Sequence, residues 1–180
     1  MNDTAAILRS RARALARSTA PLAADVDSLE LVEFRLATER YALETRHVHE
    51  VHVLRDLTPL PGTPAFVRGI VNLRGRIVPV FDLKRFFGLP EQGLTDLHRI
   101  IVVRGRDLEL GLLADVVTGV RTLARAALQA SLPTLSDIAG DYLLGVSADR
   151  VVVLDLERIL ADPKIVVDDS VESQDPGAYS

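Results

Sequence analysis

The residues with the clearest potential for chemistry are the histidines of the segment "RHVHEVH", where His47, His49 and His52 flank Glu50. Imidazole nitrogens are common zinc ligands, so the run raises the hypothesis of a metal-binding β-barrel protein. The spacing differs from the helical H-E-x-x-H motif, because only one residue separates Glu50 from His52. On a strand, His47 and His49 share a face while His52 points the other way. Three-histidine ligation therefore needs a kink, and solvated histidines at a strand edge are the favoured interpretation.

Other catalytic groups are scarce. The chain has no cysteine, which excludes thiol catalysis, disulfides and thiolate metal sites. No serine lies in a nucleophile motif and no phosphate-binding loop is present, so we expect no enzyme activity and no cofactor. The net charge of −4 is too mild for a nucleic-acid binder, and the N-terminal arginines lack interleaved aromatic residues that could stack on bases.

The N-terminal segment, residues 1–28, differs in composition from the rest. "TAAILRSRARALARS" is rich in Ala, Leu and Arg, which are good helix formers, and a linker follows at Pro21. We expect a helical extension that is solvated or loosely docked, with a partner-binding or membrane-surface helix as the alternative. Arginines occupy the place of a signal peptide's apolar stretch, and no apolar run is long enough to span a bilayer. The chain is expected to be cytoplasmic.

The remaining chain has the pattern of short strands. Val32, Phe34 and Leu36 alternate with polar residues, as in a half-buried strand. The stretch "GIVNLRGRIVPVFDLKRFFG", residues 69–88, predicts a hairpin with an Arg-Gly turn, followed by a short helix that begins near Asp82. Residues 161–180 form an acidic tail that we expect to be flexible.

The two halves of this region resemble each other. Asp82 and Asp155 lie in matching V-x-D-L motifs, 73 residues apart. The residues of the earlier hairpin, Tyr41, Leu43, Val48 and Val51, recur 69 positions later as Leu110, Leu112, Val117 and Val120. An internal repeat with four or five short strands per half predicts a mainly β fold of two small five-stranded barrels, at about residues 31–88 and 99–160, with a groove between them. Each duplicated aspartate is expected to cap a bracing helix.

A known family shares this order of motifs. The segments "LVEFRLATERYALE", "TPAFVRGIVNLRGRIVPVFDL" and "DYLLGVSADRVVVLDL" resemble the CheW family of chemotaxis adaptors, and the resemblance covers about residues 29–160. It implies a CheW-like domain of paired SH3-like barrels, which agrees with the repeat. It also implies a non-enzymatic scaffold that couples the cytoplasmic tips of methyl-accepting chemoreceptors to the histidine kinase CheA, in arrays at the membrane.

The resemblance also implies a receptor-binding groove between the barrels, of the kind that accepts a helix through apolar anchors. The alternative for the candidate lining residues is that they are plain core. The candidates are Val48, Val51, Val117 and Val120.

Four further positions match family residues tied to receptor and kinase coupling. Arg74 and Glu50 are expected to form a salt bridge that braces the receptor-facing surface. Gly69 and Gly75 match glycines tied to coupling, and for both the alternative is a requirement of backbone geometry, such as positive φ in the turn at Gly75.

Overall fold

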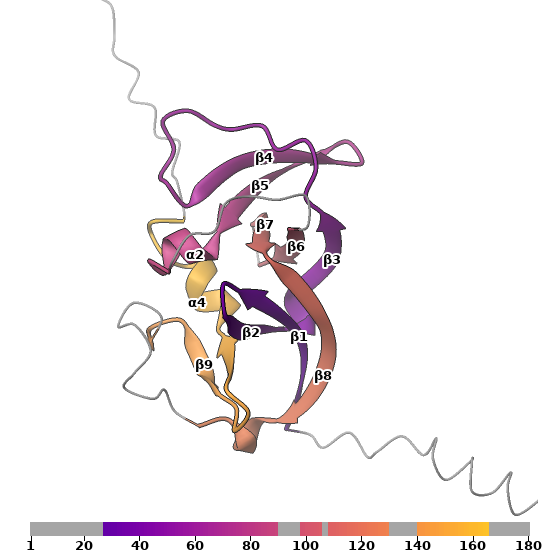
Figure 1. Cartoon of the computed structure of the whole chain (residues 1–180), viewed down its shortest axis with the longest axis vertical. Helices are drawn as coiled ribbons and strands as arrows, with labels where there is room; N and C mark the ends of the chain where they lie inside the picture. Colours follow the sequence, from indigo (N-terminus) through magenta and orange to yellow (C-terminus); the bar gives the residue numbers. More distant parts are fainter. Residues whose placement is uncertain (1–26, 90–97, 106–107, 130–139, 166–180) are drawn as a thin grey trace, which may run out of the picture.

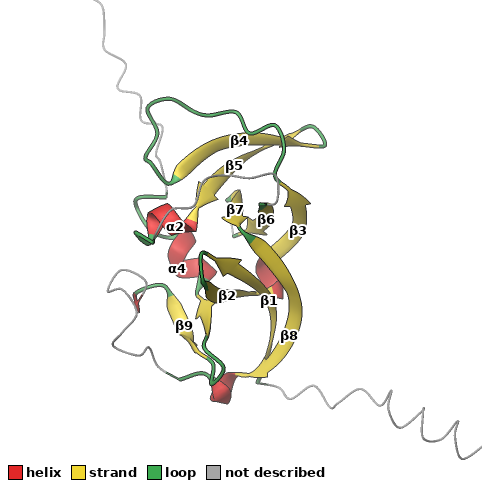
Figure 2. Cartoon of the chain, in the orientation of Figure 1, coloured by secondary structure: helices red, strands yellow, loops and turns green. Residues whose placement is uncertain are grey.

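The computed structural model describes residues 27–89, 98–105, 108–129 and 140–165, and its strands form two five-stranded sheets (Figures 1 and 2). The first sheet has the order β8-β1-β2-β10-β9, with β1 (Ser28–Leu36), β2 (Glu39–Glu44), β8 (Val116–Ala124), β9 (Leu143–Val146) and β10 (Val151–Leu154). The second sheet has the order β3-β6-β7-β5-β4, with β3 (Val48–Val53), β4 (Val67–Leu73), β5 (Arg76–Asp82), β6 (Arg99–Arg104) and β7 (Glu109–Ala114). Short helices are η1 (Thr45–His47), α2 (Leu83–Phe86), η2 (Arg125–Ala127) and α4 (Leu156–Leu160).

The mainly β prediction with two small subdomains is confirmed, with two corrections. Each sheet keeps two edge strands, so the subdomains are open SH3-like sheets rather than closed barrels. The sheets also do not follow the division at residues 31–88 and 99–160, because the first sheet joins β1 and β2 to β8, β9 and β10. In each half, the last three strands (β3–β5 or β8–β10) form a sheet with the first two strands of the other half. The predicted helix within residues 1–28 lies outside the described residues.

The internal repeat is visible in the registers. In the first sheet Val120 pairs with Val32, and in the second sheet Val51 pairs with Ile101, at equivalent places. Both strand pairs also contain a register shift at matching points, between Val48 and Glu50 in β3 and opposite the step from Glu33 to Phe34 in β1. The parallel pairs β5–β7 and β10–β2 are equivalent too. The two sheets are therefore copies of one arrangement, built by exchange of strands.

The largest core cluster is shared by both sheets. Phe34 and Leu43 from the first sheet meet Ile101 and Leu112 from the second, all fully buried. Two smaller clusters lie on the other side of each sheet, one around Ala42 and Val153 and one around Val71, Val80 and Val102. A fully buried aliphatic or aromatic side chain contributes about 1.5–3 kcal/mol. The shared cluster therefore joins the two subdomains.

Both predicted helix caps are present. Asp82 Oδ1 accepts a hydrogen bond from the Lys84 amide at 3.0 Å, and Asp155 Oδ1 accepts one from the Arg158 amide at 3.1 Å. The two helices, α2 and α4, lie on the same side of the molecule between the sheets (Figure 1), and their buried apolar residues Leu83, Leu156 and Ile159 join the shared cluster. Within the described ranges, no helix is long and apolar enough to cross a membrane.

Candidate partner-binding surfaces

The four predicted groove valines divide into two pairs. Val48 and Val117 are partly buried and pack against the shared core cluster. Val51 and Val120 are exposed, at 42% and 62%. Members of each pair are equivalent in the repeat, one on edge strand β3 and one on edge strand β8. The plain-core alternative thus fits Val48 and Val117, and of these four valines Val51 and Val120 are the two that offer an apolar surface to a partner.

The exposure of these two valines follows from their position at the sheet edges. In β3 the burial alternates, so that Val51 and Val53 face solvent while Glu50 and His52 are partly covered. In β8 the exposed large apolar residues are Val116 and Val120. An edge strand has one neighbour instead of two, which leaves one side of its residues uncovered.

Glu50 forms an ion pair with Arg76 rather than with Arg74, so the predicted Arg74–Glu50 salt bridge is wrong. The Glu50 carboxylate accepts a hydrogen bond from Arg76 Nη2, and its Oε2 lies 2.7 Å from His52 Nε2. The hydrogen bond with His52 lowers the pKa of Glu50, and the guanidinium group of Arg76 adds to this effect against a smaller opposing effect of burial. Arg76 also binds Glu109 of β7. This group ties the edge strand β3 to the middle of the second sheet.

Arg74 instead forms the tip of the β4–β5 hairpin. Leu73 pairs with Arg76, so the loop has two residues, and both have positive φ, 53° at Arg74 and 87° at Gly75. Two central residues with positive φ form a type I′ turn, whose twist matches that of the strands. The Gly75 amide donates to Asn72 Oδ1 at 2.7 Å. Within the described ranges Arg74 has no ion pair, and its exposed side chain is presented to solvent.

Gly69 occupies a place where no side chain fits. Its φ is 138°, and a Cβ there would lie 2.1 Å from the carbonyl oxygen of Thr58. Gly145 is its equivalent in the repeat, with φ 154° and a Cβ position 2.8 Å from the carbonyl oxygen of Gln129. In both cases a crossing segment forms a β-bridge to the residue that follows the glycine, Thr58 to Ile70 and Gln129 to Val146. The backbone-geometry interpretation therefore accounts for Gly69.

The histidines do not assemble into a metal site. His52 contacts Glu50, whereas His47 belongs to η1 and its Nε2 lies 3.9 Å from Glu157. His49 is exposed at the register shift of β3. Across the ranges that the structure describes, no group of three or more His, Cys, Asp and Glu side chains is placed to hold a metal ion. The metal-binding alternative receives no support.

Sequence reasoning missed a buried polar cluster around Asp115, at the point where the chain passes from β7 to β8. Asp115 Oδ1 lies 2.6 Å from Lys84 Nζ and 2.8 Å from His98 Nε2, and Oδ2 accepts from the Ala37 amide at 2.6 Å. Burial raises the pKa of Asp115, but the hydrogen bonds from Lys84 and Ala37 and the charges of Lys84 and His98 outweigh it, so the net pKa is lowered. The contributing residues come from distant segments, so no local pattern announces them.

A second group of charged residues connects strands of the first sheet to the β9–β10 turn. Asp149, in the β9–β10 turn, lies 2.8 Å from Arg121 of β8 and 3.4 Å from Arg40 of β2. Glu33 of β1 is within 3.6 Å of Arg40 and 3.4 Å of Arg121. The hydrogen bonds with Arg121 and with Ser147 hold the pKa of Asp149 far below its usual value. The turn is thus attached to the opposite edge strand of its sheet.

Comparison with known proteins places these features in a family. Residues 30–164 match the model of the CheW-like domain. The chemotaxis protein CheW of Thermotoga maritima is 33% identical over 146 residues, which cover 78% of this chain and 93% of that protein. Protein PilI of Pseudomonas aeruginosa is 30% identical over 136 residues, covering 76% of each chain.

A solved structure agrees with the fold. The crystal structure of the scaffolding protein TtCheW from Thermoanaerobacter tengcongensis matches with a TM-score of 0.67 and 32% sequence identity, over 76% of this chain and 94% of that one. The matched region of the family model includes both capped helices and both sheets, apart from the first two residues of β1. The chain therefore belongs to the CheW family.

Proposed function

We propose that this protein is a non-enzymatic adaptor that couples methyl-accepting chemoreceptors to a CheA-type histidine kinase in the cytoplasm, at membrane-associated receptor arrays. The observation that carries the proposal is the match to the CheW-like domain over residues 30–164, which includes every strand of both sheets except the first residues of β1. Two relatives, aligned over 81% and 78% of this chain, are each named chemotaxis protein CheW.

The surfaces support a scaffold that holds partners. Val51 and Val120 expose apolar side chains on the edge strands β3 and β8, and a helical receptor tip needs such anchors. The shared core cluster lies behind both strands, because Val48 and Val117 pack on it, so the two anchors stand on a rigid support. We assign the receptor contact to Val51 and Val120, with Val48 and Val117 as their buried supports.

A second surface suits the coupling to the kinase. The β4–β5 hairpin presents Arg74 at its tip and exposes Ile77 to 60%. Glu50 lies across the sheet from this hairpin and is joined to it by Arg76. We assign Arg74 and the hairpin around Gly75 to the coupling surface, with Glu50 and Gly69 fixing the hairpin's position.

The test is a pull-down of the purified protein with the CheA kinase of the same organism, followed by an autophosphorylation assay with receptor fragments. We expect stoichiometric binding to the kinase, and a receptor-dependent change in autophosphorylation only when the adaptor is present. A folded protein that binds neither partner would contradict the proposal, and circular dichroism establishes the folded state in the same sample.

A further inference from the structure

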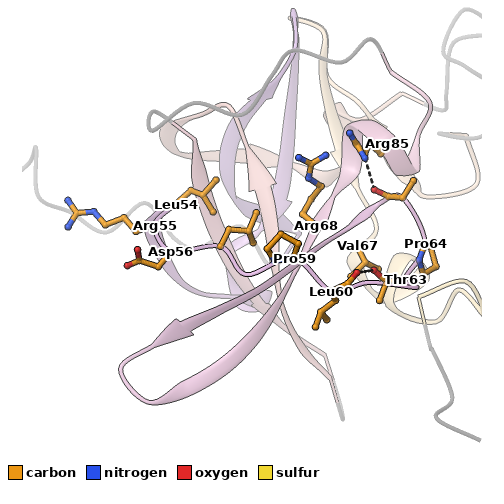
Figure 3. Close-up of a pocket in the computed structure, with 12 residues that line it drawn as sticks. Leu54, Arg55, Asp56, Pro59, Leu60, Thr63, Pro64, Val67, Arg68 and Arg85 are labelled. Atoms are coloured by element: carbon orange, nitrogen blue, oxygen red, sulfur yellow. Dashed lines mark hydrogen bonds between the residues drawn. The ribbon is translucent and has the colours of Figure 1, made fainter. Parts of the chain in front are cut away.

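A surface cavity of about 670 Å³ lies between the segment that follows β3 and the neighbouring parts of β4 and α2 (Figure 3). Its apolar lining comes from leucines and prolines, among them Leu54, Leu57, Pro59 and Leu60. The cavity belongs to the second sheet alone and is separate from the edge-strand valines and from the hairpin tip.

The cavity is positively charged. Arg55, Arg68 and Arg85 line it, and Asp56 is the one acidic lining residue. Figure 3 shows Arg68 and Arg85 at one end and Arg55 with Asp56 at the other. Arg85 Nη1 donates to the Ala65 carbonyl at 3.1 Å, whereas the described part of the chain supplies no ion pair for Arg55 or Arg68. An arginine-lined apolar cavity suits a segment that carries both acidic and small apolar residues.

A series of side-chain contacts connects the last described residues to the lining of this cavity. Ile165 is buried in the shared core, and Asp162 accepts a hydrogen bond from the Tyr142 hydroxyl. The Tyr142 ring lies 5.3 Å from the ring of Phe86, which lies 5.4 Å from the ring of Phe66. Phe66 is flanked in sequence by Ala65 and Val67, which both line the cavity. Three rings in contact thus separate the end of the described chain from the cavity.

The sequence that follows has the matching composition. Residues 166–180, "VVDDSVESQDPGAYS", contain four acidic residues, Asp168, Asp169, Glu172 and Asp175, and no basic one. Val166, Val167 and Val171 are small apolar residues among them. An extended chain advances about 3.3–3.6 Å per residue, so a segment of this length can span up to about 50 Å.

We propose that residues 166–180 dock in this arginine-lined cavity of the same molecule, with their carboxylates on Arg55 and Arg68 and their valines against the leucines. The contact is governed by exposed charges, so it weakens as salt rises, since the Debye length falls from about 14 Å at 0.05 M to about 4 Å at 0.5 M ionic strength.

The test uses the full-length chain with one introduced cysteine, which is unique because the sequence has none. A nitroxide is attached at Ser170→Cys, and the amide signals of the ¹⁵N-labelled protein are compared with those of the reduced, diamagnetic sample. We expect selective broadening of the amides of residues 54–68 at low salt, reduced about threefold or more at 0.5 M salt. The substitution Arg68→Glu should reduce it similarly.

The matched control is Arg35→Glu, an exposed arginine on β1 of the other sheet, which should leave the broadening unchanged. Broadening spread evenly over the surface would overturn the proposal, as would broadening confined to the arginine-rich N-terminal segment. A mixture of nitroxide-bearing unlabelled chains with ¹⁵N-labelled wild type separates a contact within one molecule from a contact between copies. Equal broadening in the mixture would also overturn the proposal.

Discussion

Lys84 Nζ lies 2.6 Å from Asp115 Oδ1, and this ion pair joins helix α2 to the point where the chain passes between the sheets. The equivalent positions in the repeat are Glu157 of α4 and Arg46 of η1, which lie 4.0 Å apart. The charges are reversed, and this second pair is exposed while Lys84 is buried. Both halves of the repeat thus have an ion pair between the short helix and the segment that connects the sheets. The signs of the two charges are opposite in the two halves, and only the Lys84–Asp115 pair has a buried member.

The first prediction concerns Asp115→Asn. The substitution removes the negative charge beside a buried ammonium group, so we expect a loss of about 3 kcal/mol in the free energy of unfolding. The matched control is Glu157→Gln in the exposed equivalent pair, which should cost less than about 0.5 kcal/mol. Urea denaturation of the two variants measures both. Equal losses in the two variants would contradict the difference in burial.

The same residue predicts a pH dependence. The pKa of Asp115 is lowered in the folded state, so its ionised form stabilises the fold above the usual aspartate value, and the stabilisation is lost as the pH falls through the lowered folded value. The difference in stability between wild type and Asp115→Asn should therefore be constant near neutral pH and shrink below about pH 4. Urea denaturation between about pH 3 and pH 8 tests the direction of this change in stability. A difference that grows towards low pH would contradict it.

Substitutions at Gly69 and Gly75 separate the loss of stability caused by steric crowding from the loss caused by positive φ in the turn. Gly69→Ala places a Cβ 2.1 Å from a backbone oxygen, so we expect a loss of about 3 kcal/mol. Gly75→Ala meets no atom within 4 Å and bears only the strain of φ 87°, a cost of about 1 kcal/mol. Thermal unfolding compares the two. If a stable Gly69→Ala protein lost kinase coupling, Gly69 would have a role beyond geometry.

Substitutions at Arg76 and Arg74 are expected to separate an effect on stability from an effect on partner coupling. Arg76→Glu places a carboxylate against Glu50 and Glu109, so the urea midpoint should fall. Arg74→Glu removes no ion pair within the described ranges and should change stability by less than about 0.5 kcal/mol. In the kinase assay with receptor fragments, Arg74→Glu should lower the coupling while its circular dichroism spectrum stays that of wild type. Unchanged coupling would remove Arg74 from the proposed surface.

Val120→Asp tests the apolar anchor on β8. Val120 is 62% exposed, so the substitution should leave the fold intact and weaken receptor binding about tenfold. Thr38→Asp, which adds the same charge at the exposed β1–β2 turn, serves as the control and should bind normally. Titration of receptor fragments by calorimetry gives the affinities. Equal affinities for the two variants would exclude Val120 from the receptor contact.

The positions of the candidate site residues were only partly predictable. The repeat correctly paired Val48 with Val117 and Val51 with Val120, because matching strands recur at a constant spacing. The sequence could not tell the buried pair from the exposed pair, since all four are valines on strands. The prediction that Arg74 pairs with Glu50 was wrong for a related reason. The turn turns Arg74 outward and leaves the next arginine, Arg76, facing the sheet.

The sequence by itself determined the strands, the Arg-Gly hairpin turn and the two helix caps, because each depends on residues close along the chain, and its recurring motifs showed the duplication. Only the tertiary structure decided that the halves exchange strands, so that β3 joins β6 and β8 joins β1. Charges agree with that exchange. Arg76 is surrounded by Glu50 and Glu109, whereas its equivalent, Asp149, is surrounded by Arg121 and Arg40.

Without the exchange, β5 would pair with β2 and β10 with β7, so Arg40 would replace Glu109 beside Arg76, and Glu109 would replace Arg40 beside Asp149. The first change would bring two guanidinium groups together, and the second would bring two carboxylates together. These interactions join residues that are separated by 26 to 109 positions. A local sequence pattern cannot predict such pairs, because their interaction energy arises only when the sheets have formed.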